Sequence, residues 1–230
     1  MNKLLLGFLI FISCISCHKE LKITESKDII KRETKNILVN IKISNFTSNI
    51  DKTKAELSAF NILRNVELNK YADTLENEAN SLLKELSTSE QGRPSWKYSI
   101  YVEDTILSMN PLGIISLLQT ECVFTGGAHP NTITKSYNYS LVYHKLLKKE
   151  DILGSTHPEN LNKLLLESFT KHNKYNIELF EKPTLELADA IGVTKDQIIF
   201  VYNRYTLACY AVGDIKIKID KSKLIDFLKI

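Results

Sequence analysis

The sequence predicts an α+β fold in which an antiparallel sheet is backed by helices. Segments with the period-two alternation of strands occur on both sides of segments with the three-four apolar spacing of amphipathic helices. Strands and helices do not alternate regularly as they do in βαβ units, and no unit of about 20 to 50 residues repeats. The 230 residues, 43% of them hydrophobic, suffice for a sizeable core in one domain or two small ones.

The charged residues are balanced and dispersed. The chain has 30 basic and 27 acidic residues, which gives a formal net charge of +3. The basic residues form no patch or stripe of the kind that contacts phosphate backbones. We therefore expect no nucleic-acid partner.

The first 17 residues are typical of an export signal. Lys3 precedes an apolar run from Leu4 to Ile12, and small residues then lead to Cys14 and Cys17. The run is shorter than the about 20 apolar residues that span a bilayer, which favours a signal peptide over a transmembrane helix. The pattern resembles a bacterial lipobox, and we favour Cys17 as the acylated residue because a polar run follows it directly. The expected location is the bacterial cell envelope, with a lipid anchor in a membrane; an ordinary secreted protein is the alternative.

Four parts follow from these patterns. A signal peptide is expected over residues 1–16 and a polar tether over 17–34. An N-terminal α+β portion with a long amphipathic helix is expected over 35–110. A C-terminal domain is expected over 111–230.

The N-terminal portion combines strands with one helix. Alternating apolar residues predict a strand over 36–46. A capping box that begins at Thr53 and an apolar rhythm up to Leu86 predict a long helix that ends before Pro94. After Pro94 the alternation returns, which predicts another strand.

The C-terminal domain opens with two strands that we expect to pair. The first covers 112–125, the second follows Pro130 and alternates from Ile133 to Tyr143, and Gly126 and Gly127 form the turn between them. Glycine suits this turn because a tight hairpin connection requires positive φ. Beyond it, the sequence predicts helices over 157–169 and 185–191, strands over 197–202 and 215–219, and a closing helix over 221–230.

Two stretches are specific enough to indicate a family. The first runs from Phe124 to Pro130, as FTGGAHP, and the second from Ile199 to Gly213, as IFVYNRYTLACYAVG. In order and spacing they resemble two motifs of the PdaC/RsiV-like extracytoplasmic bacterial domains. Those motifs read tyrosine-threonine-glycine-glycine-alanine-histidine and phenylalanine-x-x-tyrosine-x-ile-ala-pro-tyrosine-x-x-glycine. Phe124 replaces the first tyrosine and Cys209 replaces the proline.

The resemblance covers about residues 35–230 and carries expectations on fold and function. It implies a smaller N-terminal portion that precedes the domain with both motifs. The family includes a lysozyme-sensing anti-sigma factor and the non-catalytic N-terminal region of a peptidoglycan deacetylase. It therefore implies a non-catalytic binding module, with a lysozyme-like protein as the favoured partner and a peptidoglycan fragment as the second. The residues expected to bind the ligand are Thr125, Gly126, Gly127, His129, Pro130, Tyr205 and Tyr210.

The residues themselves indicate little catalytic chemistry. His129 lies just past the glycine turn and is the candidate acid or base of an alternative envelope glycan hydrolase or deacetylase. A bond to a neighbouring carbonyl is the favoured interpretation of this histidine. The other histidines lack zinc-site spacing, and no nucleophile elbow, Walker loop or dinucleotide motif occurs, so we expect no metal and no cofactor.

The sequence leaves two features open. Cys122 and Cys209 either form a disulfide or remain two free thiols. Tyrosines near the two motifs either form a recognition surface or pack within a sheet. They are Tyr137, Tyr139, Tyr143, Tyr202, Tyr205 and Tyr210.

Overall fold

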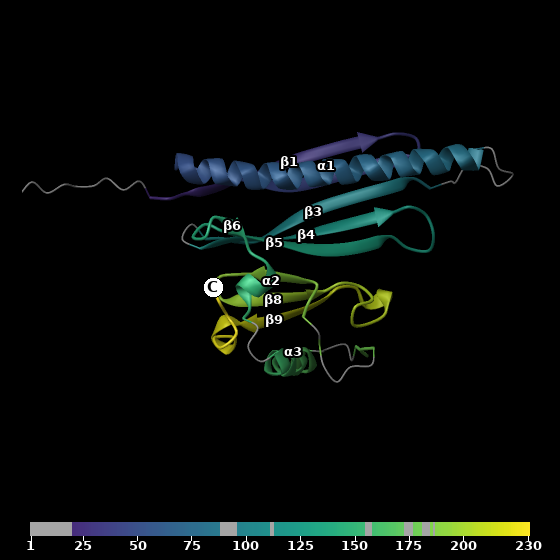
Figure 1. Cartoon of the computed structure of the whole chain (residues 1–230). Helices are drawn as coiled ribbons and strands as arrows, with labels where there is room; N and C mark the ends of the chain where they lie inside the picture. Colours follow the sequence, from purple (N-terminus) through teal and green to yellow (C-terminus); the bar gives the residue numbers. More distant parts are fainter. Residues whose placement is uncertain are drawn as a thin grey trace, which may run out of the picture.

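The computed structural model describes residues 20–87, 96–110, 113–154, 158–172, 177–180, 185 and 187–230. These residues form a six-stranded sheet in the order β1-β2-β3-β4-β5-β6 and a three-stranded sheet in the order β7-β8-β9. Helix α1 (Asp51–Ser87) lies along the first sheet, and helix α3 (Pro158–His172) lies beyond the second (Figure 1). The predicted α+β class is confirmed.

The six-stranded sheet is mixed, not purely antiparallel. Neighbouring strands are antiparallel except β2 and β3, which run parallel because the long helix α1 returns the chain to the same end of the sheet. The boundary predicted between residues 110 and 111 falls between β3 and β4, which pair with each other in this one sheet. The strands are β1 (Ile23–Glu33), β2 (Ile37–Ser48), β3 (Tyr98–Met109), β4 (Ile114–Phe124), β5 (Asn131–Ser140) and β6 (Lys145–Leu146).

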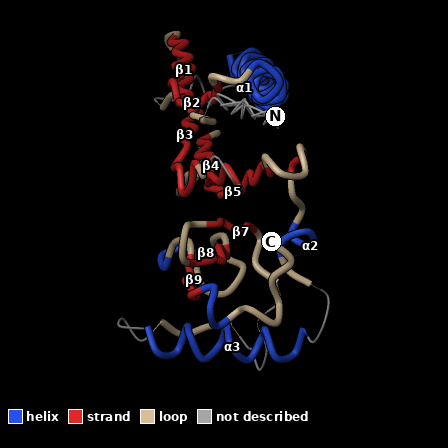
Figure 2. Tube along the Cα trace, turned by 90° about the vertical axis from the view of Figure 1, so that its left-hand side faces the viewer, coloured by secondary structure: helices blue, strands red, loops and turns tan. Residues whose placement is uncertain are grey.

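Helix α1 lies on the concave side of the six-stranded sheet, which bends around it (Figure 2). The predicted apolar rhythm is its buried face, because residues three or four apart share one side of a helix. Among the described helices, none is both long and apolar enough to cross a membrane. The buried residues of the helix are Leu57, Phe60, Leu68, Ala72, Ala79 and Leu83, and those of β2 are Ile37, Val39, Ile41, Ile43 and Phe46.

One charged residue of α1 is buried in this core. Arg64 is 1% exposed, donates to the Ser44 carbonyl at 2.9 Å and forms an ion pair with Asp104 at 2.5 Å. Asp104 also accepts from the Gln119 side chain at 3.1 Å and from the Ser44 amide at 2.7 Å. Buried charges are tolerated when paired and hydrogen-bonded in this way, and the network joins α1 to β2, β3 and β4.

The segment predicted as a tether is a strand from Ile23 onward. β1 pairs with β2 along its whole length, and Arg32 binds Asp73 of α1 at 2.6 Å. β1 is an edge strand with mixed charges, which protect an edge from further pairing and hide the alternation. This corrects the tether prediction. The predicted signal peptide, Cys14 and Cys17 lie outside the described residues.

The three-stranded sheet is antiparallel and packs on α3. It consists of β7 (Ala190–Val193), β8 (Gln197–Tyr202) and β9 (Ile215–Asp220). The helix predicted over 185–191 is wrong, because Ala190 and Ile191 pair with β8 and the described residues just before them are not helical. The chain also holds a short helix α2 (Lys149–Ile152) and the turns η1 (Tyr210–Val212) and η2 (Lys221–Lys223).

The closing helix predicted over 221–230 is also wrong. Only the single 3-10 turn η2 forms there. Hydrogen bonds from the Gly154 amide to the Phe227 carbonyl and from the Lys229 amide to the Ile152 carbonyl hold the end of the chain beside α2. The predicted inward residue Leu224 is buried nonetheless.

The two sheets meet along β7, and polar side chains of the first sheet hold the free edge of this strand. The Ile191 amide donates to Ser136 Oγ at 3.1 Å, and Asn138 Nδ2 donates to the Ile191 carbonyl at 2.7 Å. The Val193 amide donates to Ser116 Oγ at 2.9 Å. These bonds satisfy backbone groups that an edge strand would otherwise leave unpaired.

Candidate functional site

The turn between β4 and β5 depends on two glycines. Gly126 has φ +103° and Gly127 has φ +100°, as predicted, and both values are unfavourable for residues with a Cβ. The connection spans residues 125–130, longer than a two-residue hairpin turn. The indole of Trp96 covers Gly126 so closely that a Cβ there would lie 3.0 Å from Trp96 Nε1. Backbone conformation and the indole together fix this turn.

His129 leaves the turn and contacts the second motif. Its ring stacks on Tyr210 with the ring centres 3.7 Å apart and an angle of 17° between the planes. Its Nε2 lies 3.3 Å from the Tyr205 hydroxyl, and its Nδ1 lies 3.3 Å from the Pro130 carbonyl. The favoured interpretation, a bond to a neighbouring carbonyl, is part of this arrangement.

The second motif contributes two tyrosines and an arginine. The Tyr210 hydroxyl donates to the Pro130 carbonyl at 2.8 Å and accepts from Arg204 at 2.6 Å. The Arg204 guanidinium also lies over the Tyr210 ring, 4.6 Å from its centre. Tyr205 has φ +66° and remains 57% exposed. We call His129, Arg204, Tyr205 and Tyr210 the distal cluster.

One residue of β5, Thr134, holds both ends of the loop that carries the other three residues of the cluster besides His129. The Thr134 amide donates to Asn203 Oδ1 at 2.7 Å, and Asn203 Nδ2 donates to the Thr134 carbonyl at 3.3 Å. The Thr134 hydroxyl donates to Asp214 at 2.8 Å. Because the loop 203–214 is tied at its first and last residues, its rings are presented on a fixed backbone.

The structure therefore joins most of the predicted ligand-binding residues. His129, Pro130, Tyr205 and Tyr210 are in contact, Gly126 and Gly127 shape the turn, and Thr125 lies exposed at its start. The sequence did not single out the supporting residues Trp96, Arg204, Asn203, Thr134 and Asp214. Two of them, Asn203 and Arg204, lie within the second motif, which is a signal that could have indicated them.

The remaining tyrosines have other roles. Tyr137 and Tyr139 pack on Phe60 of α1, and burial raises the pKa of Tyr137 to about 12. Tyr202 is 1% exposed, and burial raises its pKa as well. Tyr143 is exposed, but at the opposite end of the molecule. Tyr137, Tyr139 and Tyr202 thus pack inside the protein, whereas Tyr143 and Tyr205 are exposed.

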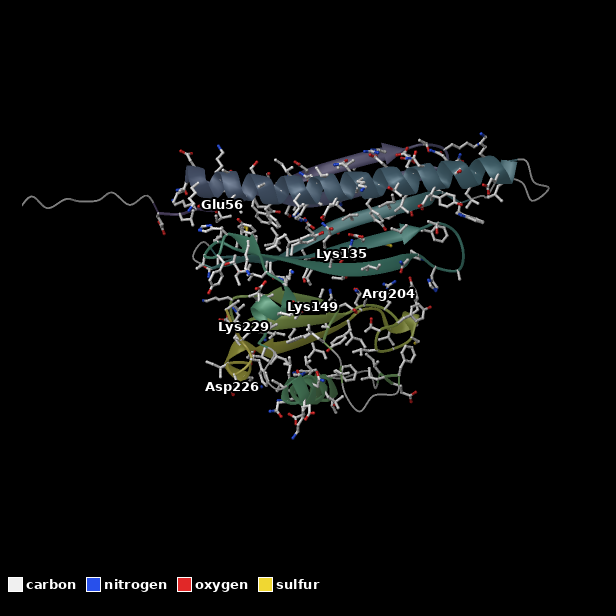
Figure 3. All side chains as sticks on the ribbon, in the orientation of Figure 1. Glu56, Lys135, Lys149, Arg204, Asp226 and Lys229 are labelled. Atoms are coloured by element: carbon white, nitrogen blue, oxygen red, sulfur yellow. The ribbon has the colours of Figure 1, made fainter. Side chains whose placement is uncertain are left out.

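The distal cluster lies at the end of the molecule away from the first described residues. β4 begins beside the end of β3 and runs to the far end of the sheet, where it enters the glycine turn. Figure 1 shows that turn and the loop before β9 at one end, and the start of α1 and the C-terminus toward the other. Figure 3 likewise shows Arg204 in the half of the molecule away from Glu56. The 11 residues of β4 span roughly 36 Å, which is about the distance between the two ends of the molecule.

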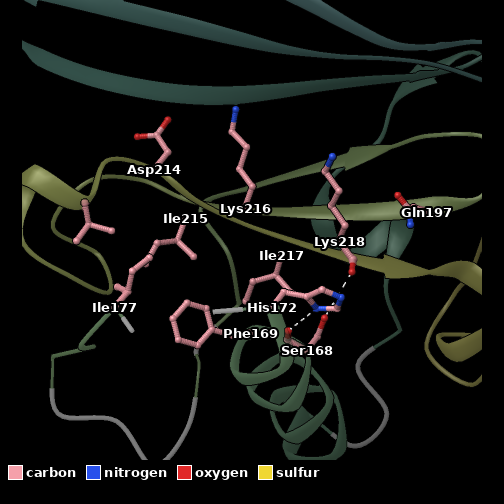
Figure 4. Close-up of a pocket in the computed structure, with 11 residues that line it drawn as sticks. Ser168, Phe169, His172, Ile177, Gln197, Asp214, Ile215, Lys216, Ile217 and Lys218 are labelled. Carbon is pink, nitrogen blue, oxygen red and sulfur yellow. Dashed lines mark hydrogen bonds between the residues drawn. The ribbon is translucent and has the colours of Figure 1, made fainter. Parts of the chain in front are cut away.

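A cavity of about 400 Å³ adjoins the loop on its other side, between α3 and β9 (Figure 4). Its walls are largely apolar, with Phe169, Ile177, Ile215 and Ile217. His172 lines it too, but its Nδ1 lies 2.8 Å from the Ser168 carbonyl of its own helix. This cavity contains no ring of the distal cluster.

No set of three or more histidine, cysteine or acidic side chains in the described part of the chain is arranged to hold a metal ion. Cys122 is half-buried and Cys209 is exposed, and both are free thiols. The open question of a disulfide is therefore answered in favour of free thiols in this structure.

Two regions of the chain match models of known protein families. Residues 30–132 match the family model described as Deacetylase PdaC, and residues 145–222 match the one described as Protein of unknown function (DUF3298). A solved DUF3298 family structure from Bacteroides fragilis NCTC 9343 is 18% identical, with a TM-score of 0.57 over 91% of this chain and 93% of that chain. Another from Pseudomonas aeruginosa PAO1 is 20% identical, with a TM-score of 0.58 over 91% and 94%. A comparison with curated proteins gives no match.

The chain has an α+β fold in which a six-stranded and a three-stranded sheet share one interface, and the two solved DUF3298 structures have a similar fold. The first matched region contains the glycine turn and His129, and the second contains Arg204, Tyr205 and Tyr210. The chain thus combines a PdaC-like region with a DUF3298-like region, as the resemblance of its motifs predicts. Domains of the PdaC type are typically extracytoplasmic, and the function of the family is uncertain.

Proposed function

We propose that this protein is a lipid-anchored binding module of the bacterial cell envelope that recognises a lysozyme-like muramidase through the distal cluster. The observation that carries the proposal is the exposed ring surface built where the two family motifs meet. Tyr205 is 57% exposed, and Trp96, which covers the adjoining turn, is 46% exposed. Aromatic side chains of this kind, with apolar faces and polar tips, are favoured at protein recognition surfaces.

The rigidity of the cluster supports a binding role. Asn203 and Asp214 fix the loop ends on Thr134, and the Tyr210 ring contacts both Arg204 and His129. A surface that is already ordered loses less conformational entropy when a partner binds. A peptidoglycan fragment is the second candidate ligand, because flat exposed rings also offer stacking faces.

The position of the cluster agrees with the proposed anchor. An acyl group on Cys17 would hold the end of the molecule where the described chain begins. The distal cluster is at the other end and would face away from the membrane, where an extracytoplasmic ligand approaches.

Titration calorimetry tests the proposal. We expect the unacylated mature chain to bind lysozyme saturably, with muropeptides titrated in parallel and both mixtures analysed for cleavage products. Tyr205→Ala should weaken binding by roughly tenfold or more, since central aromatic contacts contribute about 2 kcal/mol or more. The matched control is Tyr143→Ala, because Tyr143 is 62% exposed at the opposite end and should not affect binding.

Three outcomes decide between the functions. Binding without cleavage supports the module. Cleavage or deacetylation of the glycan that is lost in His129→Ala would support the alternative enzyme. Equal affinity of Tyr205→Ala and the unmodified chain would contradict the distal cluster as the binding surface.

A further inference from the structure

The end of the molecule opposite the distal cluster carries the first described residues. Asn49 Nδ2 donates to the Glu20 carbonyl at 2.7 Å, and the Lys22 amide donates to Asn49 Oδ1 at 2.9 Å. These bonds fix the chain beside the start of α1 from Glu20 onward. We call residues 20–22, 49–54, 141–145 and 221–225 the proximal end.

The folding of β1 leaves little free chain between this end and the proposed anchor. Cys17 and Glu20 are three residues apart, and an extended chain spans at most about 3.6 Å per residue. An acyl group on Cys17 would therefore hold Glu20 within roughly 11 Å of the lipid. The proximal end must then lie against the membrane surface itself.

Two apolar side chains project from this end. Val142 is 59% exposed and Tyr143 is 62% exposed, in the turn between β5 and β6. The turn is held in place, because the Tyr143 amide donates to Ser140 Oγ at 3.1 Å and His144 contacts Glu56 of α1 at 2.7 Å. Because the turn is fixed, both apolar side chains stay exposed to solvent. Burying them against a partner surface would be favourable.

Lysines occur at the start of the helix that contacts this turn. Lys52 and Lys54 are exposed in the first turns of α1, next to the Glu56 that binds the 141–145 turn. Among the acidic residues here, Glu56 contacts His144, and Asp151 pairs with Lys145 at 2.8 Å. Glu20 and Asp51 are also exposed, so the proximal end has two acidic residues against its six lysines, Lys22, Lys52, Lys54, Lys145, Lys221 and Lys223.

The C-terminal segment adds a second apolar projection at the same end. Ile225 is 73% exposed and follows the exposed Lys223. Lys221 and Ile230 line a cavity of about 590 Å³ together with Met109 of the β3–β4 hairpin, which places this segment at the proximal end.

We propose that the proximal end binds an anionic phospholipid surface, with Val142 and Tyr143 among the headgroups and Lys52 and Lys54 against lipid phosphates. Tyrosine and lysine both suit this boundary, because each has an apolar body and a polar tip. Each lysine close to an anionic surface strengthens binding about fivefold. The inference rests on the proposed lipid anchor for its geometry, but the contact itself is made by residues of the folded body.

Vesicle sedimentation of an unacylated chain tests the contact separately from the anchor. The chain would start at residue 17 and carry Cys17→Ser; it contains every described helix and strand. We expect it to bind vesicles with about 30% phosphatidylglycerol in phosphatidylcholine more tightly than phosphatidylcholine alone. The double change Val142→Ser with Tyr143→Ser should lower the partition coefficient about tenfold or more. Tyr205→Ser, at the distal end, is the matched control and should have no effect.

Fluorescence reports which end touches the lipid. Trp96 is the single tryptophan of the chain and covers the distal turn, so vesicles should not change its emission. In a Trp96→Phe background, Val142→Trp should shift its emission to shorter wavelength and be quenched by brominated lipid. Quenching of Trp96, or no vesicle binding by the unacylated chain, would overturn the inference. Either result would leave the lysozyme titration unaffected, so the two proposals fail separately.

Discussion

At the scale of single residues, backbone conformation shapes the distal cluster. Gly126, Gly127 and Gly213 have positive φ, and so does Tyr205, whose side chain makes this conformation costly. A strained non-glycine residue persists only where its surroundings fix it, and such residues are concentrated at functional sites. Here Asn203 and Asp214 fix the loop that carries Tyr205.

The two turn glycines should respond differently to a methyl group. Each alanine substitution should cost about 1–2 kcal/mol of unfolding free energy because the backbone is left-handed. Gly126→Ala should cost more than Gly127→Ala, since the new Cβ would lie 3.0 Å from Trp96 Nε1, whereas nothing lies within 4 Å at Gly127. Urea unfolding measures both values, and Trp96→Ala should remove the difference. Equal costs, or unchanged stability in both variants, would contradict this account of the turn.

The sequence indicates the glycines and rings of the candidate site more directly than the residues that support them. The turn glycines, His129 and the exposed tyrosines are marked by local motifs. Thr134 and Asn203 are 69 residues apart, and their pairing depends on how the second sheet packs on the first. No local pattern carries that information.

At the scale of elements, the sequence predicts the strongly periodic helices and strands, but it does not predict the edge strands β1 and β7. The strand at 36–46, the long helix, the β4–β5 pair and the strands at 197–202 and 215–219 are all present. β1 was missed because an edge strand with one solvent-facing side can be polar. The sequence predicts a helix where β7 forms, because its four apolar residues carry no usable period and tertiary pairing decides their conformation.

The bonds that hold β7 should make a measurable contribution to stability. Asn138 is 2% exposed, donates to the Ile191 carbonyl and contacts Ser116 Oγ at 2.6 Å. Asn138→Leu would leave the Ile191 carbonyl and Ser116 Oγ buried without their hydrogen bonds to this side chain. The free energy of unfolding should fall by about 1–3 kcal/mol. Urea unfolding would measure the lost stability, and hydrogen exchange would show faster exchange of the Val193 amide. Asn45→Leu is the control, because its bond to Asp28 is exposed and should be worth less than about 1 kcal/mol. Equal losses in the two variants would contradict the special role of the β7 edge.

At the scale of the whole molecule, one sheet links the two regions that the sequence separates. β4 and β5 pack on α1 with one face and hold β7 with the other. The sequence indicates that such strands are buried, but the order of the strands and the bend of the sheet arise from pairings between distant segments. The same arrangement places the distal cluster and the proximal end at opposite ends of β4 and β5.

The orientation of the molecule in the envelope depends on which cysteine is acylated. We expect lipid labelling and detergent-phase partitioning of the full chain to be lost in Cys17→Ala and kept in Cys14→Ala, because the apolar signal and small residues lead to Cys17 and a polar run follows it. Metabolic labelling with a fatty acid measures this directly, with Cys209→Ala as the control for an exposed thiol outside the signal. Labelling lost only in Cys14→Ala would place the anchor six residues from Glu20, not three. The reach would then double to roughly 22 Å, and the proximal end would no longer be forced against the lipid surface.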